Sequence, residues 1–326
     1  SLRDAGFETA AFTEDAYVST NYGFSFGFDR FVERPTPPEK RARETFADGI
    51  RYLHEHRKGH FFLFLHTYQV HDPYTPSAAY RSFFRAPEEP AAEPVGIDVP
   101  TRHRAEFDDY DRGIRETDDV LAGFLRELDR MGLGERTYVV LVSDHGEAFG
   151  EHGATRHGFG PHQEQLHVPL IVRGPGIAAG RRVETPGSLV DVAPTLLELL
   201  GAPPLGQAQG ISRCAALHGN AEAVSSARPL YFEWSGEGAA GVRFGRWKFV
   251  QLGQQNLLFD LTTDPRERSL VRDHASVEQL AMQYLTDRAR MVRLVGERPP
   301  SEAGASNGPV ISDQTRKTLR ALGYAE

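Results

Sequence analysis

The order of apolar and polar positions along the chain predicts a protein of mixed helices and strands. Residues 61–65 and 138–142 are continuously apolar and rich in aromatic or β-branched side chains. We expect both runs to be buried strands of a parallel sheet, because such strands are covered on both faces. Between them, apolar residues recur every three or four positions over residues 103–131. This spacing predicts one long amphipathic helix that turns a single face to the core.

Weaker patterns predict the other elements of the first two thirds of the chain. The expected elements are two strands and two helices, at residues 7–12 and 168–172 and at residues 39–57 and 191–200. Asp191 stands where its side chain would cap the last of these helices. Residues 21–31 alternate aromatics with glycine, which indicates a loop that its aromatics anchor in the core. Residues 86–100 are rich in Pro, Ala and Glu, which indicates an exposed loop.

From about residue 225 the pattern changes. Short apolar segments separated by glycines and polar turns predict an antiparallel sheet, at residues 230–234, 242–244, 247–252 and 257–260. A helix is expected at residues 276–295, then a linker at 299–309 and a short closing helix. The predicted fold class is therefore α/β. We expect a doubly wound, mostly parallel sheet flanked by helices over residues 1–225, and a smaller antiparallel α+β subdomain over residues 226–326.

Composition narrows the classes of function. The chain has 326 residues, 40% of them hydrophobic, and a net charge of −8, which argues against nucleic acid as a partner. No apolar run approaches the ~20 residues that cross a bilayer. A single cysteine, Cys214, excludes an intrachain disulfide. The chain begins without Met in what resembles the end of a helix, so we expect it to be a fragment. Nothing in it indicates its oligomeric state or location.

The strongest candidate chemistry follows the second apolar run. Asp144 and His145 come directly after this predicted strand, and ligands of open α/β sheets bind just beyond the carboxyl ends of strands. A carboxylate beside an imidazole can hold a divalent cation. In the alternative interpretation, Asp144 caps the next turn and His145 bonds the backbone. Five of the thirteen histidines lie in this stretch: His145, His152, His157, His162 and His167.

Two further groups could bind or transform an anion. His71, beside Asp72 after the first apolar run, could act as a general acid or base, or could brace the loop. Arg156 and His157 together offer a guanidinium and an imidazole, which suit an anionic substrate, although such a pair is also typical of a surface loop.

Other residues carry weaker signals. Glu147, Glu151 and His152 are interpreted mainly as loop structure. No nucleophile, phosphate-binding loop or dinucleotide fingerprint is recognisable.

Several segments, in matching order, resemble the sulfatases of the alkaline-phosphatase-like superfamily. SDHGEAFGEHG, followed by RHG and HVPLIVRGPG, resembles the second metal-site segment of that family. HFFLFLHTYQVHDPYTP resembles its histidine-bearing strand end, and YDRGIRETDDVLAGFL its long helix. GRWKFVQ and LFDLTTDPRE resemble its C-terminal subdomain. The likeness therefore extends over most of the chain.

This resemblance implies a fold and a reaction. It implies an α/β core with a small antiparallel C-terminal domain, and hydrolysis of a sulfate ester of a small molecule or glycan with one divalent metal. Calcium is the expected ion, with manganese or zinc as alternatives. By position, Asp144 and His145 would be metal ligands. His71 would contact the sulfate and help protonate the leaving oxygen, and His157, or in the alternative Arg156, would bind sulfate oxygens.

The sequence also departs from the family pattern. The family's nucleophile is a cysteine oxidised to formylglycine, or a serine, in a Cys/Ser-x-Pro-x-Arg motif upstream of the segment that GFETAAF resembles. Neither this motif nor the first pair of metal-binding aspartates occurs in this sequence. We expect the chain to begin after them, and alone to bind metal weakly and to be inactive on sulfate esters. His162 also stands where a tyrosine is common.

Two other functions stay open. A phosphodiester or phosphonate hydrolase, or a phosphoethanolamine transferase, of the same superfamily would differ in the nucleophile, with Thr or Ser in place of Cys. A non-catalytic protein that keeps the fold and an anion-binding pocket would lack a nucleophile altogether.

Overall fold

The structure is a computed structural model of the 326-residue chain. It describes residues 2–35, 41–84, 99–158, 160–206, 208–220, 228–234 and 239–296. These residues form two compact units, unit 1 up to Thr137 and unit 2 from Tyr138 onward. The predicted domain boundary near residue 225 stays a prediction. The predicted linker, the closing helix and nearly all of the loop predicted at 86–100 lie outside the described residues.

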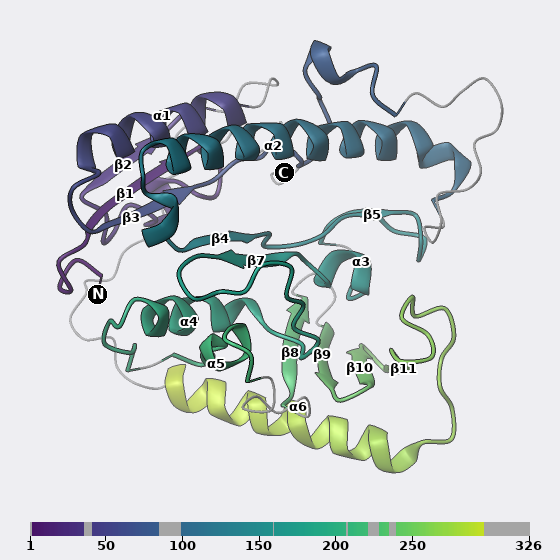
Figure 1. The fold of residues 1–326 in the computed structure, drawn as a ribbon. Coiled ribbons are helices and arrows are strands. Elements are labelled where there is room, and N and C mark those ends of the chain that lie inside the picture. The colour runs from purple at the N-terminus through teal and green to yellow at the C-terminus, as the bar shows by residue number, and fades with distance from the viewer. Residues whose placement is uncertain are drawn as a thin grey trace. The chain divides into compact units, whose positions relative to one another are not determined.

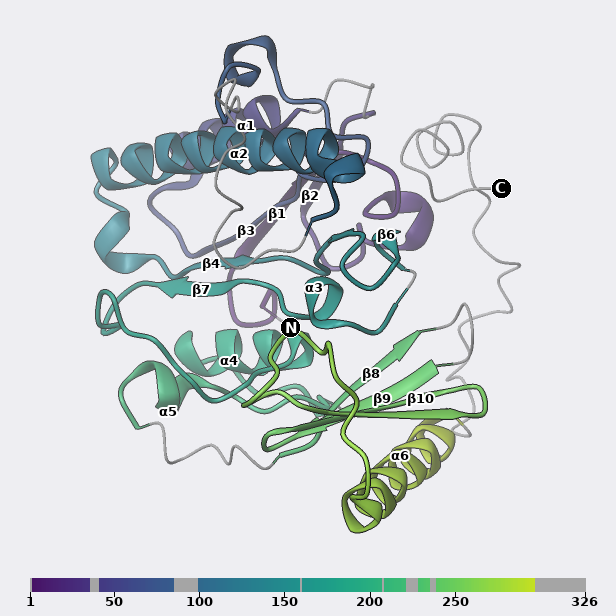
Figure 2. The same ribbon diagram turned by 90° about the vertical axis from the view of Figure 1, so that its right-hand side faces the viewer.

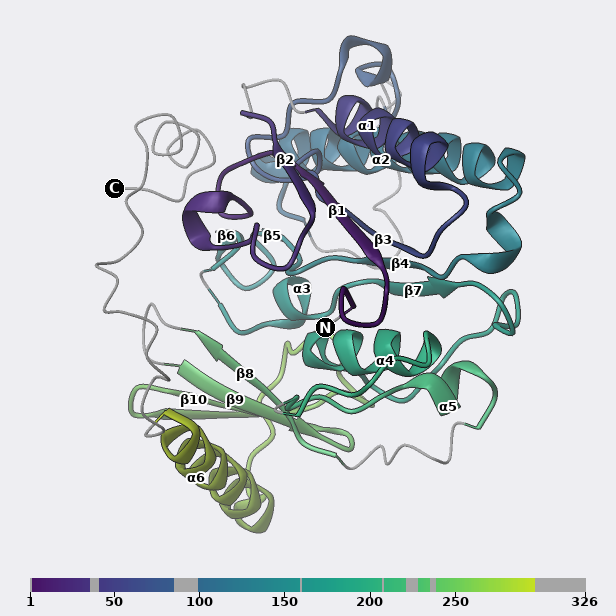
Figure 3. The ribbon, with the colours of Figure 1, turned by 90° about the vertical axis from the view of Figure 1, so that its left-hand side faces the viewer.

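Unit 1 is built on a parallel sheet with the strand order β2-β1-β3 (Figure 3). Its strands are β1 (Glu8–Thr13), β2 (Arg30–Glu33) and β3 (Phe61–Leu65). The central strand, β1, buries its last five residues. The prediction of a parallel strand at residues 61–65 is confirmed, but its full burial is wrong. β3 lies at the edge of this sheet, and all five of its residues are only partly buried.

Two helices complete unit 1. α1 (Ala42–His56) packs on β1 and β3, and α2 (Arg104–Arg130) runs alongside α1 (Figure 1). The rings of Phe46 on α1 and Phe124 on α2 meet edge to face, with their centroids 5.6 Å apart. Both helices were predicted from apolar spacing and are confirmed. Short 3₁₀ helices lie at Thr20–Tyr22, Ala78–Tyr80, Thr101–His103 and Gly134–Arg136.

The aromatic loop before β2 is anchored by fewer side chains than its sequence suggests. Phe28 stacks on Phe62 of β3, with ring centroids 6.0 Å apart. Phe26, however, is 93% exposed and Phe24 is 46% exposed. The prediction that the aromatics of residues 21–31 anchor this loop in the core is therefore correct for Phe28 and wrong for Phe24 and Phe26.

Unit 2 begins with a strand whose direction and burial differ from the prediction. β4 (Val139–Val142) pairs antiparallel with β7 (Leu170–Arg173). Leu141 and Val142 remain 36% and 39% exposed. An apolar run alone does not distinguish parallel from antiparallel pairing. The segment between the two strands brings the chain back alongside β4 in the opposite direction. β4 and β7 therefore form a two-stranded antiparallel sheet, and β4 is not a parallel strand as predicted.

The link from β4 to β7 carries the short hairpin β5 (Ala148–Phe149) and β6 (Thr155–Arg156) and then α3 (Gln163–Leu166). Two backbone hydrogen bonds tie α3 to the segment after β4. Gly146 N donates to Gln165 O and Glu147 N to Glu164 O, at 2.8 and 2.9 Å. A Cβ at Gly146 would lie 2.1 Å from Glu164 O, so this close approach requires glycine.

Asp191 corrects one predicted role. It immediately precedes α4 (Val192–Leu199), but its buried carboxylate makes no capping hydrogen bond to that helix. It instead accepts hydrogen bonds from Arg213 and Arg228, and from the backbone of Ser188 in a capping box around the 3₁₀ turn Leu189–Asp191. Two guanidinium groups outcompete the helix N-terminus for a buried carboxylate, because charge-assisted hydrogen bonds are the stronger ones. A short helix, α5 (Cys214–Leu217), follows.

The rest of unit 2 is a four-stranded antiparallel sheet with the order β11-β10-β9-β8. The strands are β8 (Leu230–Trp234), β9 (Ala239–Phe244), β10 (Trp247–Leu252) and β11 (Gln255–Asp260). α6 (Ala275–Gly296) packs across one face of it (Figure 2). Val242, Phe249, Leu258 and Ala281 form the core between them. The predicted meander and helix are confirmed. Among the described residues, no helix is long and apolar enough to cross a membrane.

Candidate active site

The segment that follows β4 holds Asp144 and His145 in a tight turn. Ser143 Oγ donates to His145 O at 2.6 Å, and His145 N donates to Asp144 Oδ1 at 3.1 Å. These bonds turn both side chains to the same side, so that Asp144 Oδ1 lies 3.8 Å from His145 Nε2. The Asp144 side chain is 77% exposed. An exposed carboxylate and an imidazole nitrogen thus lie next to each other.

The hydrogen bond on the other ring nitrogen of His145 fixes its tautomer. Nδ1 lies 2.8 Å from Gly146 O, and a carbonyl oxygen only accepts, so Nδ1 carries the proton. In the neutral ring, Nε2 then carries the lone pair, which is the state a metal ligand requires. Two ligands of one cation with bonds of ~2.0–2.6 Å stand at about the observed 3.8 Å spacing. Asp144 and His145 therefore fit the expected metal.

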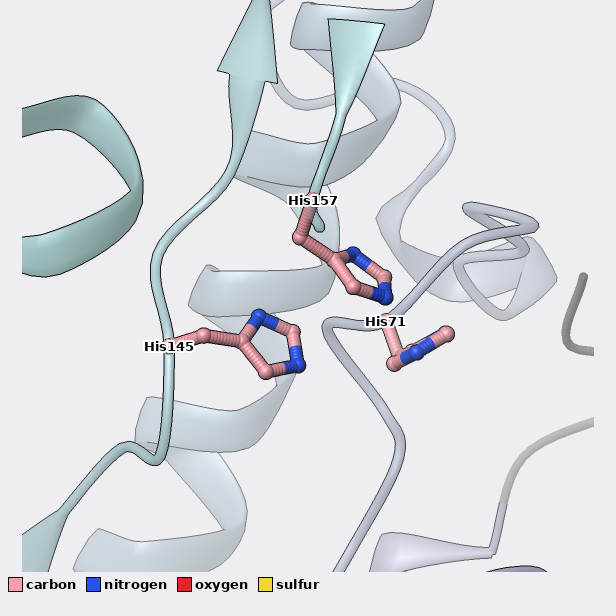
Figure 4. Close-up of side chains that lie close together, drawn as sticks. All are labelled: His71, His145 and His157. Atoms are coloured by element: carbon pink, nitrogen blue, oxygen red, sulfur yellow. The ribbon is translucent and has the colours of Figure 1, made fainter. Parts of the chain in front are cut away.

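His157 joins this pair from the end of the hairpin. Its ring stacks on that of His145, with the centroids 4.0 Å apart and the planes 24° apart (Figure 4). Its Nδ1 donates to the buried carboxylate of Glu147 at 3.0 Å. Glu147 was predicted to be mainly loop structure, but it also orients the ring of His157. This hydrogen bond fixes the orientation of the imidazole ring beside His145.

Arg156 precedes His157 in an unusual backbone conformation. Its φ is +68°, in the left-handed region that non-glycine residues seldom adopt, and it is exposed at the end of β6. Such a conformation turns the chain sharply between the strand and His157. The structure thus brings Asp144, His145 and His157 together in unit 2, with Arg156 as the chain neighbour of His157.

His71 belongs to unit 1, on the loop that follows β3, and is labelled in Figure 4. It is 6% exposed. Its Nδ1 donates to Asp72 O at 2.5 Å, and its backbone N donates to Tyr68 O. Tyr68 N in turn donates to the buried carboxylate of Glu14, which follows the parallel strand β1. The loop with His71 is therefore tied to the carboxyl edge of the parallel sheet, where its sequence position placed it.

A pocket of about 160 Å³ opens beside His145 within unit 2. It is lined by His145, Gly158, Gly160, Pro161, Gln165, Leu166, Phe232 and Glu233. Gln165 is 4% exposed, and its Nε2 has no hydrogen-bond partner among the described residues. Leaving a buried donor unpaired costs about 1–3 kcal/mol. Sequence reasoning missed this residue, and it missed Phe232 and Glu233 because they lie far along the chain from His145.

A second polar cluster is formed by residues of α3 and of the loop that precedes it. His152 and His162 stack almost in parallel, with ring centroids 3.8 Å apart. His152 Nδ1 bonds Glu164 at 2.8 Å, and His162 Nδ1 bonds Glu267 at 3.1 Å. Glu267 is fully buried and forms an ion pair with Lys248 of β10, which is 1% exposed. The cluster joins the loop of the candidate site to the antiparallel sheet.

This cluster is predicted to make the stability of unit 2 depend on pH. The hydrogen bond to Glu164 raises the pKa of His152 above its ordinary 6.5. Burial acts to raise the pKa of Glu267, but the hydrogen bond from His162 and the charge of Lys248 outweigh it and lower that pKa below 4.5. The histidine therefore stabilises the fold below about pH 6.5 and loses this effect as pH rises through its folded-state pKa. The glutamate stabilises above about pH 4.5 and loses its effect as pH falls.

We expect the free energy of unfolding of unit 2 to fall as pH rises from about 6 to 9, and to fall less in a His152→Gln variant. Urea unfolding followed by tryptophan fluorescence measures this, because Trp234 and Trp247 are the only tryptophans of the chain and both belong to unit 2. If the free energy of unfolding fell equally with pH in both proteins, His152 would not be the titrating group.

Comparison with known proteins decides the family. The sulfatase family profile matches residues 1–202, and a profile described as N-sulphoglucosamine sulphohydrolase, C-terminal, matches residues 150–294. The chain belongs to the sulfatase family. All the candidate site residues of this sulfatase-family chain, His71, Asp144, His145, Arg156 and His157, lie in the stretch that the sulfatase profile matches.

Curated sulfatases match about half of the chain. It is 33% identical over 165 residues to arylsulfatase K of Mus musculus, and 31% identical over 164 residues to choline-sulfatase of Rhizobium meliloti. These stretches cover 47% and 48% of this chain but only 30% and 31% of those proteins. The matched stretch is thus less than a third of each relative.

Solved structures match nearly the whole chain in fold. One, solved in complex with its substrate D-glucosamine-2-N,6-O-disulfate, has a TM-score of 0.73 at 18% identity and covers 93% of this chain and 83% of its own. Phosphonate monoester hydrolase of Agrobacterium radiobacter has a TM-score of 0.69 at 20% identity, covering 90% and 79%. The predicted α/β fold with a C-terminal antiparallel sheet is confirmed.

Proposed function

We propose that the protein is a metal-dependent sulfuric ester hydrolase acting on a sulfated small molecule or glycan. The observation that supports this most directly is the arrangement after β4. A carboxylate of Asp144 lies 3.8 Å from the Nε2 of His145, and the imidazole of His157 stacks on the same ring. A cation site directly beside an imidazole suits the oxyanion of a sulfate ester. Membership of the sulfatase family supports the same reaction.

Each residue has a proposed role. Asp144 and His145 hold the metal, which when bound supplies positive charge to stabilise the transferred group. His157, oriented by Glu147, donates a hydrogen bond to a sulfate oxygen, with Arg156 as a second candidate for this contact. His71 is proposed to contact the sulfate and protonate the leaving oxygen. The proposal for His71 rests on the resemblance of its segment HTYQVHDP to the family.

The metal is proposed to be calcium, as the resemblance implies. The two ligands of this segment are an oxygen and an imidazole nitrogen, a combination that also suits manganese or zinc. The nucleophile is proposed to be a formylglycine, which has no counterpart in this sequence. No residue of this chain is therefore assigned the nucleophilic step.

We expect the full-length protein to hydrolyse 4-nitrophenyl sulfate, and chelation of its metal to lower the rate roughly 100-fold or more, since the metal offsets the charge that develops in the transition state. Restoring activity with calcium, manganese or zinc in turn identifies the ion.

Parallel assays with a phosphate ester and a phosphonate ester separate the competing functions. Faster turnover of the phosphonate than of the sulfate would contradict the proposal and favour the phosphonate hydrolases. Binding of sulfate without turnover of any ester would favour a non-catalytic anion-binding protein.

A further inference from the structure

Glu14 lies directly after β1, at the carboxyl end of the central strand of the parallel sheet in unit 1. Its carboxyl group is fully buried and accepts hydrogen bonds from two segments that are distant in the sequence. Arg41 N and Thr45 Oγ1, at the start of α1, each donate to it at 3.4 Å. Tyr68 N, in the loop that follows β3, donates to it at 3.3 Å. A buried carboxyl group is costly unless it is hydrogen-bonded, so these contacts tie the loop after β3 to the end of β1.

Tyr68 extends this attachment to His71. Its carbonyl oxygen accepts the backbone N–H of His71 at 2.9 Å. Its ring meets the imidazole edge to face, with the centroids 5.4 Å apart and the planes at 85°. Both side chains are buried, and Nδ1 of His71 also donates to Asp72 O. The position and the plane of the imidazole are therefore set by its contacts with Tyr68 and Asp72.

The turn after Glu14 holds Tyr68 from a second side. Asp15 and Ala16 are buried and have φ of 61° and 58°, in the left-handed region that non-glycine residues seldom adopt. This turn brings Tyr17 N to the hydroxyl group of Tyr68, which accepts its hydrogen bond at 3.2 Å. Strained residues persist only where the surrounding structure holds them, and they are concentrated at functional sites. Two in succession therefore mark this end of β1 as more than a connection between elements.

We propose that Glu14 is a positioning residue for His71 and acts on it through Tyr68. The inference rests on the proposed function, in which His71 protonates the leaving oxygen, and adds the residue that holds this acid in place. An acid assists bond cleavage only when its proton lies within hydrogen-bonding reach of the leaving oxygen. A displacement of the imidazole by about 1 Å can therefore lower the rate by roughly 100-fold. Glu14 is fully buried, so its effect passes through the loop and not through contact with the substrate.

The leaving group of the ester distinguishes this role from a purely structural one. 4-Nitrophenolate departs with little help from an acid, because its nitro group delocalises the negative charge. Phenolate is a stronger base, so its departure depends more on proton transfer. Displacing the acid should therefore slow the hydrolysis of phenyl sulfate much more than that of 4-nitrophenyl sulfate. A smaller fraction of folded protein would instead slow both reactions by the same factor.

We expect Glu14→Leu in the full-length protein to lower kcat/KM about 100-fold for phenyl sulfate and less than about tenfold for 4-nitrophenyl sulfate. Glu14→Gln should keep most of the activity on both esters. One oxygen of Glu14 accepts both backbone hydrogen bonds, and glutamine retains an oxygen there. Burial raises the pKa of Glu14, which favours the uncharged carboxyl group that the amide resembles. Thr45→Val removes a partner of Glu14 on α1 only, so this control should leave the ratio of the two rates unchanged.

A double variant tests whether the effect passes through His71. His71→Ala should show the same selective loss on phenyl sulfate. Adding Glu14→Leu to it should then leave the ratio of the two rates unchanged, because the acid that Glu14 positions is already gone. An equal loss on both esters in Glu14→Leu, or a further selective loss in the double variant, would overturn the inference.

Two further results keep the test decisive. If Glu14→Leu does not fold, Tyr68→Phe replaces it, since this variant removes only the hydroxyl group that accepts from Tyr17 N. It should slow phenyl sulfate several-fold more than 4-nitrophenyl sulfate, and an unchanged ratio of rates would overturn the inference. If the unaltered full-length protein hydrolysed neither ester, the proposed function itself would be wrong.

Discussion

Replacing Asp144 by alanine is expected to lower the hydrolysis of 4-nitrophenyl sulfate by the full-length protein by roughly 10²–10³-fold, the scale of losing one electrostatic group of an active site. Oδ1 of Asp144 lies 3.8 Å from Nε2 of His145. Its loss leaves His145 as the one metal ligand on this segment. Metal affinity and turnover should therefore fall together, and excess metal should restore part of the rate.

The stability of the variant separates this role from a structural one. The Asp144 side chain is 77% exposed and contacts the neighbouring His145, so the unfolding midpoint should hardly change. Asp118→Ala, at an exposed aspartate on α2, is the matched control and should keep full activity. Full activity of Asp144→Ala would remove the metal assignment, and a large loss of stability would point to folding instead.

The sequence predicted those parts of the fold that local spacing determines. α1, α2 and the four strands of the C-terminal meander appear where apolar periodicity and glycine-containing turns placed them. The direction of β4 was not predictable, because its partner is chosen by the path of the loop between Val142 and Leu170. The prediction that Asp191 caps α4 was wrong for a similar reason. Two arginines more than twenty residues further along the chain compete with the nearby helix end for its carboxylate.

The candidate site shows the same limit. Asp144, His145 and His157 were accessible to sequence reasoning because they are close neighbours along the chain after one strand. Gln165 and Phe232 were not, since their position in the pocket depends on how α3 and β8 pack beside His145. Glu267 gave no signal at all, because its partner His162 lies 105 residues earlier. Such long-range contacts follow from the tertiary fold, and no local pattern of residues encodes them.

Replacing Glu267 by glutamine is expected to lower the free energy of unfolding by about 3–5 kcal/mol, as when one partner of a buried ion pair is removed. Lys248 is 1% exposed, and Glu267 is its ion-pair partner within the described residues. The substitution leaves this ammonium buried without a carboxylate beside it. It also weakens the bonds that His162 and Gln163 N make to the same side chain. Glutamine keeps the size of the side chain and adds no further strain at its φ of +56°.

Replacing the other partner of the ion pair should lower the free energy of unfolding by less. In Lys248→Met, Glu267 keeps its hydrogen bonds from His162 and Gln163 N, so less of its charge is left uncompensated. The double variant Lys248→Met/Glu267→Gln should accordingly be more stable than Glu267→Gln alone, because no unpaired charge stays buried. Urea unfolding followed by tryptophan fluorescence gives all the values. Asp287→Asn, which breaks an exposed pair with Arg290 on α6, is the matched control and should stay within about 0.5 kcal/mol. The contrary result would be a double variant whose loss of unfolding free energy equals the sum of the losses in the two single variants. Lys248 and Glu267 would then not be coupled, and their ion pair would not be what joins the loop of the candidate site to the antiparallel sheet.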